Sequence, residues 1–501
     1  MRGWGQVAAV LAVGCGTPEP DLEPRFVRGG VLFPGPEFVE HAWAPGGTFE
    51  RGGRSWSAPD KADCVPLFSV PLGDVSSIVF RGGEPPDTTM AFSPDGRKLA
   101  IGAYTGEVVI VDAWTGAERT RRSFPEALIK RVLWSGDGAT LYVGEQSAEA
   151  RLLALDAETL ADRWVVSLAE VVGRSPPPAG DDLYGVYSLP GIFGLDGLEN
   201  GDLLVTAAHG WTSGDGRKNA STIVRYSSEG VRLAGWPEQG AIDGTLLHPS
   251  MSGDRIAVQV GRSADGPPPA DLPVGGVVVL DSQLKMDRTR KLDPLLPWFP
   301  TVFVWEAFDF DGERLLVGTG DGRVMLFHGE ESVTVPLGTP LSPDGVPLAA
   351  SVGFGRLAGE GALVVTASTS VPYGAADPSW RPPAPHPNAN ALWFYGFDGE
   401  LRWTWRGPHE IQGVTLSPDG KEAVVGSGPR ISDRRSDLFG ALVFRVAGDG
   451  SGDERLECFC STASPVFFRQ AWAKDGRFAV SEHPYRDGEQ VRGSYQVTVF
   501  R

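Results

Sequence analysis

Residues 90–119 read MAFSPDGRKLAIGAYTGEVVIVDAWTGAER, and this stretch decides the fold. A short apolar strand is followed by the tight turn Ser-Pro-Asp-Gly at 93–96. Two segments follow in which hydrophobic residues alternate with polar or small ones. Asp tolerates the turn geometry and Gly supplies a positive φ, while a period of two is typical of strands. A further turn at 112–116 opens a fourth, more polar strand. The stretch therefore predicts one four-stranded antiparallel sheet, which must stack on copies of itself to bury its faces.

The same succession of strands and turns recurs to the end of the chain. Its units hold about 40–60 residues each, a period typical of a β-propeller in which every unit is one blade. We therefore predict an all-β protein with a β-propeller fold, and eight four-stranded blades are favoured over seven. The units lie at about 90–119, 130–168, 191–236, 244–291, 302–337, 363–407, 414–448 and 471–501.

The last unit ends after its third strand, which would leave one sheet with an open edge. A strand ahead of the first unit can fill this position, and the stretches 64–70 and 76–81 are the candidates. We predict that this N-terminal strand completes the last blade and closes the ring.

Three of the four cysteines fall near this closure. Cys458 and Cys460 lie just before the last unit, and Cys64 begins the first candidate strand. A disulfide from Cys64 to either of the other two would hold the closure together and contribute about 2–4 kcal/mol. A structural zinc site needs a fourth ligand that the sequence does not visibly supply, so we expect a disulfide and no metal.

The N-terminal residues have the order of a secretory signal. Arg2 precedes a mainly apolar run at 4–13, which is too short to span a bilayer. Ala-Val-Gly-Cys at 12–15 resembles the lipobox of bacterial lipoproteins. This resemblance implies lipidation of Cys15 and a location at the outer membrane or cell surface; the alternative is an ordinary signal peptide with an incidental cysteine. The predicted division of the chain is a signal peptide at 1–14, a tether and irregular lead-in at 15–60, and a single propeller domain at 61–501.

Some units resemble the repeats of known propeller families. Residues 93–102 and 417–426 are similar to WD40-like and bacterial surface-propeller repeats. Residues 154–164, which end in Trp164, resemble the quinoprotein-type (PQQ-like) repeat, in which a tryptophan docks between neighbouring blades. Most units lack that tryptophan, so we expect no quinone cofactor. In architecture and address the chain also resembles an eight-bladed lipoprotein scaffold of bacterial outer-membrane protein assembly, a likeness that implies fold rather than activity.

Charge and motifs favour a binding protein over an enzyme. The chain has 45 Lys and Arg against 63 Asp and Glu, a net charge of −18 that argues against nucleic acid and anionic membrane surfaces as partners. The sequence has no CxxCH, HExxH, GxxxxGK[ST] or GxSxG motif. The histidines are isolated from one another, and we expect turn or surface positions for His41, His209, His248, His328, His386, His409 and His483.

Long connections between the second and third strands distinguish one face of the predicted propeller. Long loops in compact domains are usually functional, and these connections all emerge on the same face. They lie at 209–221, 261–275, 369–391, 427–439 and 482–494. Aromatic and basic residues within them suit protein or glycan recognition. The candidate partner-binding residues are Trp211, Lys218, Trp380, Arg381, Arg430, Arg434, Arg435, Tyr485 and Arg486.

The sequence therefore predicts an exported, monomeric, non-enzymatic propeller that binds a protein or carbohydrate through its long-loop face. A lipid anchor would be its sole contact with the membrane, and no cofactor is expected. The alternative is an enzyme with its site at the channel mouth, namely a hydrolase, a lactonase or a quinone-dependent dehydrogenase.

Overall fold

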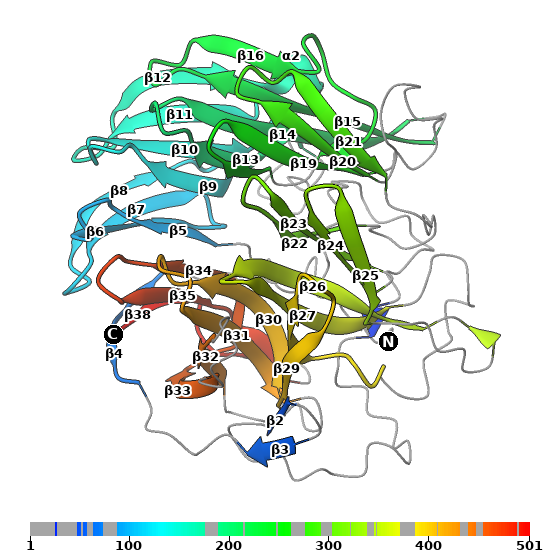
Figure 1. Ribbon diagram of the computed structural model, residues 1–501. Helices are drawn as coiled ribbons and strands as arrows, with labels where there is room; N and C mark the ends of the chain where they lie inside the picture. Colours follow the sequence, from blue (N-terminus) through cyan, green and yellow to red (C-terminus); the bar gives the residue numbers. More distant parts are fainter. Residues whose placement is uncertain are drawn as a thin grey trace. The chain divides into compact units, whose positions relative to one another are not determined.

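The computed structural model confirms a nearly all-β protein, whose strands are mostly paired antiparallel and group into the blades described below (Figure 1). Its described residues form two compact units, one of residues 88–291 and one of residues 26–73 together with 303–501. Among them, no helix has the length and hydropathy needed to span a bilayer. The structure describes residues 26–27, 48–51, 54–57, 64–73, 88–175, 189–213, 216–246, 249–261, 276–291, 303–320, 322–337, 345–346, 348–370, 386–407, 409–430, 439–446, 454–487 and 490–501.

The unit at 88–291 contains four blades, each running from an inner to an outer strand. The first holds β5 (Thr89–Phe92), β6 (Lys98–Gly102), β7 (Glu107–Asp112) and β8 (Glu118–Ser123), and the second holds β9 (Leu128–Trp134), β10 (Thr140–Gln146), β11 (Arg151–Asp156) and β12 (Asp162–Ser167). The third holds β13 (Gly191–Gly197), β14 (Leu203–Ser213), β15 (Gly216–Tyr226) and β16 (Arg232–Trp236). The fourth holds β17 (Thr245–Leu246), β18 (Ser250–Ser252), β19 (Arg255–Gly261), β20 (Gly276–Asp281) and β21 (Met286–Lys291), and the short helix α2 (Ala169–Val172) follows the second blade.

The other unit also contains four blades and the N-terminal strands. The fifth blade holds β22 (Phe303–Phe310), β23 (Arg314–Thr319), β24 (Arg323–His328) and β25 (Glu331–Pro336), and the sixth holds β26 (Ala349–Ala358), β27 (Gly361–Ser370), β28 (Ala391–Gly396) and β29 (Leu401–Arg406). The seventh holds β30 (His409–Leu416), β31 (Glu422–Arg430), β32 (Phe439–Arg445) and β33 (Arg455–Thr462). The eighth holds β34 (Val466–Trp472), β35 (Phe478–Glu482), β38 (Gln496–Phe500) and β4 (Pro66–Pro71), with the hairpin β36 (Tyr485–Asp487) and β37 (Gln490–Arg492) between β35 and β38.

The turn predicted at 93–96 is held by side-chain contacts. Ser93 Oγ donates to Asp95 Oδ1 over 2.6 Å, and the Ser93 carbonyl accepts from Gly96 N, which has φ of 69°. The hydrogen bond from Ser93 lowers the pKa of Asp95. The same contacts recur at 135–138 and 417–420. The interpretation of these Asp-Gly pairs as turns is therefore confirmed.

Tryptophans join neighbouring blades within the unit at 88–291. Trp134 of the second blade donates its indole N–H to the Ala91 carbonyl of the first over 2.9 Å. Trp164 donates in the same way to the Ser228 carbonyl of the third blade over 2.8 Å. Gly230 lies against this ring with φ of 81°, and a Cβ added to it would lie 2.8 Å from the indole. The docking role that the quinoprotein-type resemblance implied for Trp164 is present.

Trp403 and Trp405 alternate on β29 and are among the largest fully buried side chains. Trp403 stacks on Phe394 of its own blade, with ring centroids 5.7 Å apart. Trp405 meets Phe444 of the seventh blade edge to face at 5.1 Å. Trp405 therefore packs at the interface between the sixth and seventh blades.

An N-terminal strand completes the eighth blade, as predicted (Figure 1). β4 pairs antiparallel with β38, from Pro71 opposite Gln496 to Pro66 opposite Phe500. The hydroxyls of Ser69 and Thr498 lie 2.7 Å apart across the two strands. The alternative strand at 76–81 lies outside the described residues.

Strands β1 (Phe26–Val27), β2 (Thr48–Arg51) and β3 (Arg54–Ser57) lie within the segment predicted as an irregular lead-in. β2 pairs with the outer edge of β29, and β3 pairs with β2. The edge of β29 explains the difference, because its unpaired backbone groups accept an added strand. The domain boundaries at 14 and 60 stay predictions.

Candidate functional site

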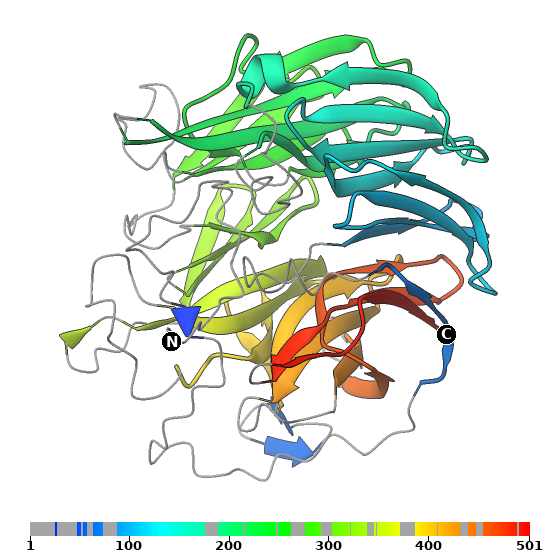
Figure 2. The same ribbon diagram turned by 180° about the vertical axis from the view of Figure 1, so that it is seen from behind.

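The connection predicted as a loop at 209–221 is mostly strand. β14 and β15 pair continuously, from Leu203 opposite Tyr226 to Ser213 opposite Gly216. The neighbouring strand β13 pairs with β14 only as far as Ala208, so the end of the hairpin extends past that neighbour. Figures 1 and 2 show β14 and β15 running side by side in both views. The backbone N–H and C=O groups of the extension are hydrogen-bonded between β14 and β15, so the extension forms strands instead of an irregular loop.

Trp211 lies on this extension, and its side chain packs against a buried histidine. Its half-buried indole contacts the ring of His209, with centroids 4.8 Å apart and an interplanar angle of 30°. His209 is 4% exposed. Its Nε2 lies 2.8 Å from the hydroxyl of Ser175, and its Nδ1 lies 3.3 Å from the carbonyl of Val172, the last residue of α2. Trp211 thus packs against a buried, hydrogen-bonded histidine. This contact restricts the rotamers of the Trp211 side chain before binding, so a partner loses less free energy to ordering that side chain.

Register brings two predicted binding residues together. Trp211 and Lys218 are directly opposite each other on β14 and β15. In the other unit, Arg430 ends β31 opposite His409, and Tyr485 and Arg486 lie on the β36–β37 hairpin. The remaining candidates, Trp380, Arg381, Arg434 and Arg435, lie outside the described residues, as does the connection at 262–275.

The end of the connection at 369–391 is hydrogen-bonded to Arg406 of the sixth blade. Arg406 donates to the carbonyl of Pro387 over 2.6 Å and to Oδ1 of Asn388 over 3.2 Å. Its guanidinium lies 5.0 Å from the centroid of Trp393, whose indole N–H donates to Thr366 Oγ1 over 3.1 Å. Burial lowers the pKa of Arg406. Residues 386–390 are therefore anchored to the blade by a partly buried cation.

Two fully buried carboxylates hold the ends of second strands. Glu145, at the end of β10, accepts from Ser147 over 2.5 Å and from Arg151 over 2.5 and 3.0 Å. Glu482, at the end of β35, accepts from the backbone N–H groups of Ala463 and Ser464 over 2.9 and 3.1 Å. Such charges persist in the interior because they are paired or hydrogen-bonded. Both contacts fix chain segments to a blade, which is a structural role.

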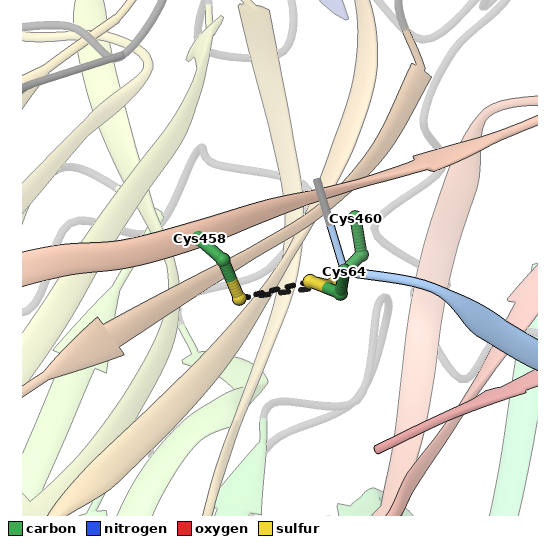
Figure 3. Close-up of a disulfide and its surroundings, with 3 residues drawn as sticks. All are labelled: Cys64, Cys458 and Cys460. Carbon is green, nitrogen blue, oxygen red and sulfur yellow. Dashed lines mark hydrogen bonds between the residues drawn. A yellow bond between two sulfur atoms is a disulfide. The ribbon is translucent and has the colours of Figure 1, made fainter. Parts of the chain in front are cut away.

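The structure brings the three cysteines together (Figure 3). Cys64 forms a disulfide with Cys460, one of the two predicted pairings, with Cα atoms 4.7 Å apart. The sulfur of Cys458 lies 2.8 Å from that of Cys64 and 3.9 Å from that of Cys460. In the part of the chain that the structure describes, this is the one group of three His, Cys, Asp or Glu side chains close enough together to hold a metal ion, with their ligand atoms within 4.8 Å of one another. Cys15 lies outside the described residues.

The turn or surface positions expected for the histidines are wrong for His209, which is buried on β14, and for His483, which is buried after β35. His386 is buried as well but begins a turn, because its carbonyl accepts from Ala389 N. His209, His386 and His483 are 4%, 3% and 0% exposed. His483 Nε2 lies 2.6 Å from the Ser481 hydroxyl, and His386 Nδ1 accepts from the backbone of Asn388 over 3.1 Å. For His209 the sequence offered a signal, because His209 and Trp211 alternate on one strand and therefore share a face.

No protein-family model and no curated protein sequence matches the chain. Among solved structures, the C-terminal WD40 domain of Sif2 is similar with a TM-score of 0.52 at 10% identity, covering 88% of this chain and 99% of that one. The chain has a β-propeller fold. BamB from Moraxella catarrhalis (TM-score 0.47, 13% identity, 88% of this chain and 98% of that one) and the RRP9 WD40 repeats (0.44, 12%, 89% and 98%) are similar at lower scores. This likeness concerns the propeller fold and its WD40-like repeats.

Proposed function

We propose that this propeller is a non-enzymatic scaffold that binds a partner protein through its second-to-third-strand connections. The observation that carries the proposal is the β14–β15 hairpin, which extends past β13 and presents Trp211 on top of buried His209. A large aromatic ring that is fixed before binding is the type of side chain that dominates protein interfaces. Lys218, directly opposite, adds a cationic residue at the same level of the hairpin.

A matched control is available in the same unit. Trp114 is a tryptophan that is more exposed than Trp211, at 45%, and it lies in the turn between the third and fourth strands of the first blade. Turns of this type emerge at the blade end opposite to the second-to-third connections, because successive strands are antiparallel. Loss of Trp114 should therefore leave partner binding unchanged.

The test compares Trp211→Ala with Trp114→Ala in cells of the native host. Each tagged chain is cross-linked in the cell with formaldehyde, purified, and its attached proteins are quantified by mass spectrometry. We expect a partner that is lost with Trp211→Ala and retained with Trp114→Ala. Equal recovery with both variants would contradict the proposal.

The proposal includes export and lipid anchoring through Cys15. The supporting observation is the disulfide between Cys64 and Cys460, since disulfides persist in oxidising compartments. Intact mass of the chain from its native membrane fraction tests this part. A mature chain that begins at an acylated Cys15 is expected, and a soluble chain cleaved elsewhere would contradict the anchor.

One contact favours a second candidate function, that of a hydrolase. Ser175 Oγ lies 2.8 Å from His209 Nε2, which is the spacing of a serine nucleophile and its base. The orienting group at Nδ1 is the Val172 carbonyl at 3.3 Å rather than a carboxylate. Release of p-nitrophenol from short-chain p-nitrophenyl esters by the wild-type protein, abolished by Ser175→Ala, would support this candidate. Equal rates for the wild-type protein and Ser175→Ala would refute it.

A further inference from the structure

The cysteine cluster joins two blades through three sulfur atoms. Cys458 and Cys460 alternate on β33, the outer strand of the seventh blade, and therefore lie on the same face of that strand. Cys64 lies two residues before β4, the strand that completes the eighth blade. Figure 3 shows the sulfur atoms of Cys458 and Cys64 directed toward each other.

The geometry places a thiol beside a disulfide. The Cys458 and Cys64 sulfur atoms are 2.8 Å apart, while Cys64 is bonded to Cys460. Cys460 is fully buried, whereas Cys64 and Cys458 are half-buried and so are reachable by solvent. Disulfides rearrange when a thiolate attacks one of the two bonded sulfur atoms, and the rate depends on access to the sulfur that is attacked.

We propose that Cys64, Cys458 and Cys460 form an exchangeable thiol–disulfide site in which Cys64 alternates between two partners. In the exchange, the Cys458 thiolate attacks Cys64 Sγ and forms the Cys64–Cys458 bond. The Cys64–Cys460 bond breaks, its electron pair stays on Cys460, and Cys460 takes up the proton that Cys458 released. One disulfide and one thiol are present before and after, so no external oxidant or reductant is needed.

The site would also react with small monothiols such as glutathione. A monothiol that opens the bond at Cys64 forms a mixed disulfide there and releases Cys460 as a thiolate. Cys458 then attacks Cys64, expels the monothiol with its proton, and restores a link between β33 and the chain leading into β4. The third cysteine thereby preserves the connection between the two blades during thiol attack.

The experiment uses the full chain and the variants Cys458→Ser, Cys460→Ser and Cys64→Ser. Each protein is treated with reduced glutathione, quenched with acid, alkylated and analysed by mass spectrometry, with circular dichroism to confirm folding. We expect a Cys64–Cys458 disulfide in Cys460→Ser and a Cys64–Cys460 disulfide in Cys458→Ser. The glutathione adduct should reach a higher level in Cys458→Ser, where only Cys460 can expel it from Cys64, than in the wild-type protein, where Cys458 can do so as well.

Three results would overturn the proposal. The first is a folded Cys460→Ser protein in which Cys64 and Cys458 are both alkylated as thiols. The second is equal accumulation of the glutathione adduct in wild-type protein and Cys458→Ser. The third is purified protein with three thiolates and one bound soft metal ion per chain, which would make the cluster a metal site instead.

Discussion

Replacing Cys64 with serine should weaken the attachment of β4 to the eighth blade. The disulfide from Cys64 to Cys460 spans 396 residues of sequence. The chain-entropy relation for such a loop gives a stabilisation of about 6 kcal/mol at room temperature. Native disulfides usually contribute less, about 2–5 kcal/mol, because the unfolded chain keeps residual structure. We expect a loss within that lower range.

The assay combines urea unfolding with hydrogen exchange. Urea titration of Cys64→Ser gives the change in free energy of unfolding. Exchange of the β4 amides at 67–70, between the two prolines that bound the strand, shows whether the loss is local. Cys458→Ser is the control, because it leaves the Cys64–Cys460 bond intact. A Cys64→Ser protein within about 0.5 kcal/mol of wild type and with unchanged β4 exchange would refute the reasoning.

Three further substitutions test the packing and the turns. Trp405→Ala removes a fully buried indole and should lower the free energy of unfolding by about 3–5 kcal/mol in urea titration; a loss below about 1 kcal/mol would contradict the packing. Gly230→Ala forces a Cβ against Trp164 at φ of 81°, so we expect a loss of about 1–3 kcal/mol and a shifted tryptophan emission, and an unchanged protein would contradict the docking. The pKa of Asp112 is lowered from 3.8 to about 2, chiefly by the hydrogen bond from Arg119. The ionised Asp112 therefore stabilises the folded protein fully above pH 3.8, and this contribution is lost as the pH falls through about 2. Asp112→Asn should remove this part of the acid sensitivity, measured as melting temperature against pH; a wild-type pH profile would contradict it.

Local sequence patterns were sufficient to predict the strands and turns of the blades. The turn at 93–96 depends on contacts within six residues, from Ser93 to Lys98, so its residues predict its geometry. The completing strand at 64–70 was predictable because the last unit lacks its outer strand, and one open edge needs one further strand. The docking of Trp164 was predictable because residues 154–164 resemble the quinoprotein-type repeat, in which a tryptophan packs between neighbouring blades.

Contacts between distant segments were not predictable in the same way. β2 forms a strand because the edge of β29, about 350 residues later in the chain, accepts it. The hairpin at 209–221 was predicted as a loop because its polar and glycine residues resemble loop composition, while its strands are stabilised by pairing with each other.

The candidate site was predicted in part. Trp211 and Lys218 were identified from their residue types and their place in a second-to-third-strand connection, and the register of the hairpin places them opposite each other. The support from His209 was missed, because the partners that bury it come from α2 and Ser175, more than 30 residues earlier. Sequence alone indicates which residues can bind, whereas the burial that fixes their side chains depends on the folded chain.

Site-specific photocross-linking at position 211 tests the central claim most directly. A photoreactive phenylalanine analogue replaces Trp211 in one protein and Trp114 in another, and both are irradiated in cells of the native host. The account predicts a discrete cross-linked partner protein at position 211 and none at position 114. Irradiation that gives no adduct at position 211, or the same adduct at both positions, would contradict the assignment of the β14–β15 hairpin as the binding site.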